Sequence, residues 1–219
     1  MSKVDALKDI LAGTPIEVSF EGDDVVLERY NGDDVNFKIP DFITKIGEGA
    51  FWMRENIESI EIPESVTEFR NSSFSECRNL TSINIPKSVK IIPENCFYDC
   101  KNLRNIELPN VVEIKPFAFY DCGSLESINL PRTLKKIGDS AFGFCIMIKS
   151  IVIPNGVSLI EKYAFETCVS LEEVIFPDSL QQIEERAFSG VNRLNRVILP
   201  KYTKLDDNVF DSNIIISRK

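Results

Sequence analysis

Eight of the 11 prolines recur at an almost fixed spacing, and this repeat limits the possible folds more than any other feature of the chain. They stand at positions 40, 63, 86, 109, 131, 154, 177 and 200, so neighbouring prolines are 23 residues apart except for one separation of 22. A period of about 20–50 residues is typical of folds in which each unit buries its apolar side chains against the next. We therefore expect a stack of similar turns.

Each unit places apolar residues at the same positions, counted from its proline. Position 12 of the aligned units is always phenylalanine: Phe51, Phe74, Phe97, Phe119, Phe142, Phe165 and Phe188. Apolar and polar residues alternate just before each proline, which predicts a half-buried strand that the proline ends. A V-x-x-I pattern then predicts a second extended segment, and A-F-x-x-C a tight turn. The expected fold is a β-rich solenoid of about eight rungs with a parallel strand ladder and a core of stacked phenylalanines.

This frame resembles the leucine-rich repeats of the BspA-like class, whose units read roughly I-P-x-S-V-T-x-I-x-x-x-A-F-x-x-C-x-x-L-x-x-I. The clearest match is the unit that contains Ile153, Pro154, Ala164, Phe165, Cys168, Leu171 and Val174. The resemblance covers residues 40–199, which we expect to hold seven leucine-rich repeats. It implies a surface adhesin or an interaction module without catalytic activity.

The N-terminal segment, residues 1–39, departs from the frame and is expected to form a helix and β-hairpin cap. We expect a short helix over residues 3–11 with Ser2 as its N-cap. Three strands are expected over residues 16–20, 25–30 and 35–39. Asn31-Gly32 between the last two strands predicts a hairpin turn there.

The C-terminal segment, residues 200–219, reads as a degenerate capping repeat. Leu205 and Phe210 follow the frame one residue early, and residues 214–216 are expected to form a final short strand. Ser217, Arg218 and Lys219 then place charge at the edge, which disfavours the stacking of another chain.

Several chemistries are excluded by composition. Histidine is absent, so histidine-dependent catalysis and histidine zinc sites are excluded. No nucleophile–base pair or glycine-rich phosphate loop is found, so we expect neither an enzyme nor a cofactor. The net charge of −9 argues against nucleic acid as a partner, and no apolar run is long enough for membrane insertion. As the chain stands we expect it in the cytoplasm, or at the cell surface or secreted if it belongs to a longer precursor.

The cysteines and the paired aspartates are the remaining candidates for chemistry. Five cysteines occupy position 15 of consecutive units and Cys96 occupies position 11, so we expect a buried ladder of six free thiols. Cysteines aligned in this way cannot surround zinc, and we expect no metal site. Asp23-Asp24 and Asp33-Asp34 would hold calcium only if their turns lie side by side, and solvated turns are the simpler interpretation.

The outward positions of the strands are the candidate binding site. In the polar slot at position 22, the last three units carry Val152, Ile175 and Ile198, which predicts an exposed aliphatic stripe on the concave face. The candidate partner-binding residues are Ser150, Val152, Glu172, Glu173, Ile175, Arg193, Arg196 and Ile198. The alternative is that β-branched residues simply suit exposed strand positions. A scattered outer set, Trp52, Tyr98 and Tyr120, is expected to be partly packed.

The most direct functional hypothesis is a non-enzymatic protein-binding module that uses the concave strand face. Its partner is a protein of unknown identity, or a second copy that meets the C-terminal part of this face. A cell-surface adhesin or host-binding fragment is one alternative. An intracellular inhibitor or immunity-type binder is another.

Overall fold

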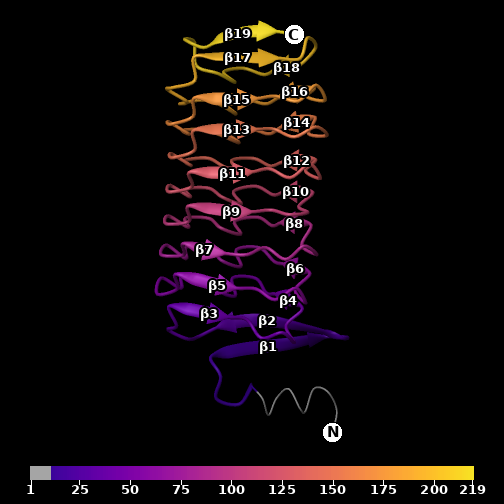
Figure 1. Ribbon diagram of the computed structural model, residues 1–219, viewed down its shortest axis with the longest axis vertical. Coiled ribbons are helices and arrows are strands. Elements are labelled where there is room, and N and C mark those ends of the chain that lie inside the picture. The colour runs from indigo at the N-terminus through magenta and orange to yellow at the C-terminus, as the bar shows by residue number, and fades with distance from the viewer. Residues whose placement is uncertain (1–10) are drawn as a thin grey trace.

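The chain winds into a tall solenoid, with β1 at one end of the stack and β19 at the other (Figure 1). The computed structural model describes residues 11–219. Each turn contributes one strand to each of two ladders that run side by side along the stack. The first ladder contains β3 (Asn36–Lys38), β5 (Ser59–Glu61), β7 (Ser82–Ile83), β9 (Asn105–Glu107), β11 (Ser127–Asn129), β13 (Ser150–Val152), β15 (Glu173–Ile175), β17 (Arg196–Leu199) and β19 (Ile215–Arg218).

The second ladder is built from the V-x-x-I segments, which confirms the second extended segment in each unit. It contains β4 (Lys45–Ile46), β6 (Glu68–Phe69), β8 (Ile91–Ile92), β10 (Glu113–Ile114), β12 (Lys136–Ile137), β14 (Leu159–Ile160), β16 (Gln182–Ile183) and β18 (Lys204–Leu205). Pairing within both ladders is parallel, as expected. The even-numbered strands from β8 to β18 form one sheet, whereas the first ladder is divided into four small sheets.

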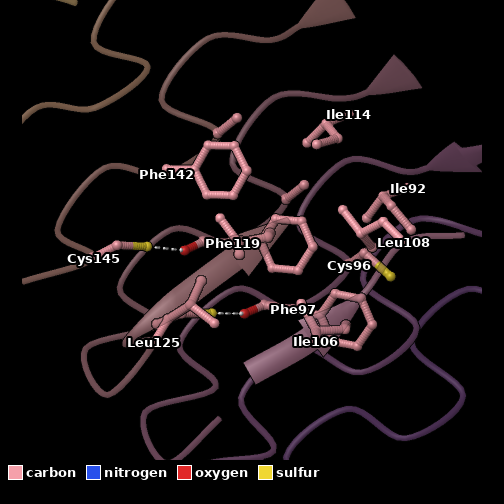
Figure 2. Close-up of a cluster of buried hydrophobic side chains, with 14 of the residues drawn as sticks. Ile92, Cys96, Phe97, Ile106, Leu108, Ile114, Phe119, Leu125, Phe142 and Cys145 are labelled. Atoms are coloured by element: carbon pink, nitrogen blue, oxygen red, sulfur yellow. Dashed lines mark hydrogen bonds between the residues drawn. The ribbon is translucent and has the colours of Figure 1, made fainter. Parts of the chain in front are cut away.

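The phenylalanines form a continuous buried column. Neighbouring rings have centroids 5.1–5.3 Å apart and are inclined by 1–24° to one another. Figure 2 shows the rings of Phe97, Phe119 and Phe142 one above the other. The column is longer than the sequence predicts, because Tyr30 stacks beneath Phe51. Together with Phe210 at the other end, it makes nine rings.

The turns that carry the phenylalanines form their own hydrogen-bonded ladder. Two residues four apart in the turn adopt a left-handed backbone, as in Asn95 (φ 54°) and Asp99 (φ 57°). This conformation directs the amide of Phe97 to the carbonyl of Ala118 at 2.8 Å, and the amide of Asp99 to that of Tyr120 at the same distance. Backbone groups of the turns are therefore satisfied by the next rung.

The cap differs from the expected arrangement. The helix expected over residues 3–11 lies outside the described residues except for Leu11, and no helix supports the cap within the described range. Strands β1 (Ile16–Glu21) and β2 (Asp24–Tyr30) do form an antiparallel hairpin, but its turn is at Gly22. The hairpin predicted at Asn31-Gly32 is wrong, because β2 pairs with β4 in the second ladder and β3 pairs with β5 in the first.

Gly32 has a different physical role from the predicted turn. The Tyr30 side chain folds under this residue, and a Cβ at Gly32 would lie 2.4 Å from the Tyr30 hydroxyl. Glycine is therefore needed for the close approach of the first ring of the column. The Tyr30 hydroxyl donates to Asp34, which ties the segment after β2 to the core.

The two aspartate pairs do not lie side by side. Asp24 begins β2, whereas Asp33 and Asp34 follow its other end. Asp24 accepts a hydrogen bond from Thr44 at 3.0 Å and pairs with Lys45 at 2.8 Å. Within residues 11–219, no group of three or more carboxylates or thiols is arranged to hold a metal ion. In the same part of the chain, no helix has both the length and the hydropathy to cross a bilayer.

The C-terminal unit continues the stack with a shifted frame. Phe210 bridges to Phe188, and the final strand is confirmed as β19, one to two residues later than expected. The Arg218 guanidinium donates to the carbonyls of Pro200 (3.1 Å) and Thr203 (2.7 Å), which fixes the last strand to the preceding turn.

Replacing Gly138 by alanine is expected to lower the free energy of unfolding by about 1–3 kcal/mol. A Cβ at this position would lie 2.8 Å from the backbone of Lys115 and Pro116 in the previous turn, so the rungs must separate. Gly123 is the matched control, because the nearest atom to its added Cβ is 3.9 Å away. Gly123→Ala should be neutral or stabilise by up to about 1 kcal/mol. Urea titration of both variants tests this, and equal midpoints would contradict it.

Candidate partner-binding surface

The outward side chains of the first ladder, positions 20 and 22 of each unit, form what we call the strand face. Its N-terminal half is polar, and several of its side chains bind to neighbouring rungs. Lys38 pairs with Glu61 at 2.8 Å. The Asn84 side chain both donates to and accepts from the backbone of Ile62, at 2.7 Å in each case.

The C-terminal half of the strand face exposes the aliphatic stripe that the sequence predicts. Val152, Ile175 and Ile198 are 57%, 50% and 46% exposed. Val152 and Ile175 are direct partners in the register of β13 and β15. The residue before each stripe residue is buried in the core: Ile151, Val174 and Val197. The strand alternation thus forces the three stripe side chains outward. Their role in binding stays a prediction.

Two hollows border the stripe and meet at Ile175, Phe176 and Lys219. The larger, about 910 Å³, includes Ser150 and Val152 among its lining residues. The smaller, about 370 Å³, is lined by four other predicted residues: Glu172, Glu173, Arg196 and Ile198. Arg193 lines neither hollow but pairs with Glu172 at 3.3 Å. The structure therefore brings the eight predicted residues together on one surface.

Sequence reasoning missed three residues at this surface. Ile215 on β19 is 65% exposed and pairs in register with Arg196, so it adds an apolar side chain at position 20 of the last rung, whereas the register partner of Ile198 is Ser217. Asp178 and Lys219 form an ion pair of 2.5 Å at the edge of the larger hollow. Ile215 follows Arg196 by 19 positions, which is fewer than one repeat, so the frame gave no signal for Ile215.

The thiols lie in the core, away from this surface. All six cysteines are free and buried, which confirms the buried ladder. Each thiol at position 15 donates to the carbonyl of a phenylalanine in the previous turn, as Cys145 does to Phe119 at 3.1 Å (Figure 2). Burial raises the pKa of Cys77 and Cys168 to about 12 and that of Cys122 further. Protonated, inaccessible thiols of this kind are poor nucleophiles.

The outer aromatic residues are partly packed, as expected. The rings of Tyr98 and Tyr120 stack at 5.4 Å with only 4° between their planes. The Trp52 indole is half-exposed and donates to Glu76 at 3.1 Å. Tyr120 also packs against Phe117 and Phe144, with ring centroids 5.6 and 5.3 Å apart, so the rings on this side partly cover one another.

A family model described as a BspA type leucine rich repeat region matches residues 30–115 and 112–218, in six copies. A leucine-rich repeat protein from T. pallidum has a similar crystal structure, with 26% identity and a TM-score of 0.78. That match covers 82% of this chain and 88% of the other. A search of the curated proteins found no match.

Two longer bacterial proteins of known structure share the fold. A leucine-rich repeat protein from Bacteroides ovatus is 26% identical with a TM-score of 0.70, and the match covers 93% of this chain and 66% of the other. A leucine-rich cell surface protein from Faecalibacterium prausnitzii is 24% identical with a TM-score of 0.65. There the match covers 93% of this chain and 53% of the other, so this chain spans about half of that protein.

Proposed function

The chain belongs to the BspA-type leucine-rich repeat family, and from this membership we propose that it is a non-enzymatic protein-binding module. Its binding surface is the C-terminal half of the strand face. The partner contacts the aliphatic stripe of Val152, Ile175 and Ile198, and the charged residues around it set the orientation.

The observation that carries this proposal is the exposure of three aliphatic side chains in consecutive rungs. Each is about half-exposed, although the same outward position is polar in the five preceding units. Apolar patches with polar rims are typical of protein-binding sites. Glu172, Glu173, Arg193 and Arg196 supply such a rim and are all exposed.

The non-enzymatic part of the proposal is supported by the chemistry of the side chains. The chain has no histidine, and its cysteines are buried with raised pKa values. A catalytic site needs converging acid, base or nucleophilic groups. The groups around the stripe are instead exposed carboxylates and guanidinium groups, which suit recognition of a charged surface.

Replacing Ile175 by aspartate is expected to abolish partner binding without unfolding the protein. A charge at the centre of the stripe must be desolvated on binding, so affinity should fall by about 30-fold or more. The measurement is affinity capture from the source organism on immobilised protein, followed by titration with the captured partner. Circular dichroism should show an unchanged fold.

Ile91→Asp is the matched control. Ile91 is 44% exposed on β8, in the second ladder, so its replacement introduces the same charge outside the strand face. It should leave binding unchanged. If Ile175→Asp binds as well as the wild type, or if Ile91→Asp weakens binding equally, the stripe is not the binding site.

The adhesin and inhibitor alternatives differ from the proposal in the partner rather than in the surface. A host or cell-surface molecule captured through the stripe would favour adhesion. An intracellular protein of the same organism would favour the inhibitor or immunity-type role. Both therefore stay predictions that the same capture experiment separates.

A further inference from the structure

We propose that the partner of this surface is a second copy of the same chain, bound face to face about a two-fold axis. The axis lies parallel to the strands, between β15 and β17, so that the two solenoids run in opposite directions. This inference rests on the proposed function, because it uses the same aliphatic stripe. An isologous contact of this kind requires a surface that is complementary to itself after the rotation.

Charge provides the first part of that complementarity. Glu173 on β15 and Arg196 on β17 occupy the same outward position of neighbouring rungs. Rotation about the proposed axis exchanges the two rungs, so Glu173 of each copy faces Arg196 of the other. The dimer therefore contains two intermolecular ion pairs, each between Glu173 of one copy and Arg196 of the other.

These two charges are not used within the chain. Neither Glu173 nor Arg196 has an ion-pair partner among residues 11–219, although both are exposed on adjacent rungs. Lys38 and Glu61, which are likewise on adjacent rungs at position 22, pair at 2.8 Å. An unpaired acid and base beside the stripe, on its two central rungs, favour a partner that supplies the opposite charges in the opposite order.

The apolar side chains obey the same symmetry. The rotation places Ile175 of one copy against Ile198 of the other, and does so twice. Both side chains are about half-exposed in the single chain. At the margins, Ile215 of one copy comes to the level of Ser150 of the other. The largest apolar contact therefore lies at the axis, where burial is most complete.

A second pair of opposite charges follows the same rule at the border of the strand face. Asp178 and Lys201 each follow the proline that ends a strand, so they occupy equivalent places after β15 and β17. The Asp178 side chain is 83% exposed even though it pairs with Lys219. Rotation brings Asp178 of one copy to the level of Lys201 of the other. Acid after β15 and base after β17 thus follow the same order as Glu173 and Arg196.

The size of the patch predicts a weak dimer. Four rungs at about 4.8 Å span only about 15–20 Å, which places the contact at the low end of protein interfaces, below about 1,200 Å² in total. The dimer should therefore form reversibly as concentration rises. In sedimentation velocity, the mass should rise from that of the 24.8 kDa chain toward twice that value between about 5 and 500 μM.

Charge reversal tests the symmetry directly. Glu173→Arg should be monomeric, because it places two arginines opposite each other at both symmetric contacts. Arg196→Glu should be monomeric for the equivalent reason. An equimolar mixture of the two variants should recover the dimer, because every contact then joins an arginine to a glutamate. Glu107→Arg is the control, since Glu107 is exposed on β9 outside the patch, and it should dimerise like the wild type.

Each outcome decides the proposal. A wild-type chain that remains monomeric at about 500 μM overturns it. Two monomeric variants whose mixture also stays monomeric overturn the two-fold geometry. Neither result removes the proposed function, because a foreign partner that binds the wild type and not Ile175→Asp would still show that the stripe binds protein. Loss of that discrimination would instead overturn the proposed function.

Discussion

Raising the pH from about 9 to about 11 is expected to unfold this protein, because its six buried thiols must remain protonated in the folded state. Burial raises the pKa of Cys77 and Cys168 to about 12 and that of the other four well above the ordinary value of 9.0. Unfolding exposes the thiols to water, where each has the ordinary pKa of 9.0 and loses its proton as the pH rises past that value. The stability they contribute is therefore complete below about pH 9 and is lost as the pH rises toward about 12.

The expected loss is large because the six thiols act in the same direction. One pH unit above its unfolded pKa, each thiol removes on the order of 1 kcal/mol from the free energy of unfolding. Six thiols together remove on the order of 5–10 kcal/mol, which is comparable to the entire stability of a typical domain. Tyr30 has the same sign, since burial and its hydrogen bond to Asp34 raise its pKa to about 12.

Thermal melts at pH 7, 9, 10 and 10.5, followed by circular dichroism, measure this dependence. The matched variant replaces both Cys122 and Cys145 with serine, whose hydroxyl can still donate to the carbonyls of Phe97 and Phe119 but does not titrate in this range. Its Tm should fall less steeply with pH than that of the wild type. Surface lysines lose their charge in both proteins and cancel in the comparison. Equal slopes would contradict the thiol explanation.

The repeating core was predictable because every unit solves the same packing problem. A single turn cannot bury Phe119, but the rings of Phe97 and Phe142 cover its two faces, so a period of 23 with a fixed aromatic position implies the column. The ends of the column were less predictable. A terminal ring has a neighbouring ring on one face only, so its other face is either covered by residues outside the repeat or left exposed. Tyr30 precedes Phe51 by 21 residues, so it falls outside the frame.

The cap shows why local turn signals were insufficient. Asn31-Gly32 has the composition of a hairpin turn, yet β2 pairs with β4 and places Tyr30 beneath the column. Glycine is still required there, because the tyrosine ring occupies the space of a side chain. The same dipeptide thus serves a tertiary contact that no local pattern encodes.

The candidate surface was predictable in its outward side chains but not in its ion pairs. Strand alternation was enough to place Val152, Ile175 and Ile198 outward, because positions 20 and 22 are free of the packing constraint. The ion pair of Asp178 with Lys219 depends on how the last strand returns across the face, which the frame does not determine. In this fold the repeat specifies the core, and the few positions that it leaves free are where recognition can differ between family members.

Replacing Phe119 by alanine at the centre of the column is expected to lower the free energy of unfolding by about 3–5 kcal/mol. The ring is fully buried, and its loss leaves a cavity between two neighbouring rings that the stacked rungs cannot close. For a chain of this length the Tm should fall by about 10–15 °C. Because each rung of a solenoid is stabilised by its contacts with the neighbouring rungs, the cavity should also weaken the coupling between the two halves and broaden the thermal unfolding transition.

Two further variants separate this loss from a general effect of removing an aromatic ring. Phe210→Ala at the C-terminal end should cost less, because that ring stacks on Phe188 on one face, meets Phe176 edge-on and is only partly buried. Trp52→Ala should change stability by less than about 1 kcal/mol, because the indole is half-exposed on the outer side. Differential scanning calorimetry gives the order directly. If the three substitutions cost the same, the rings do not act as a coupled column, and the stability of the solenoid must come from its two strand ladders instead.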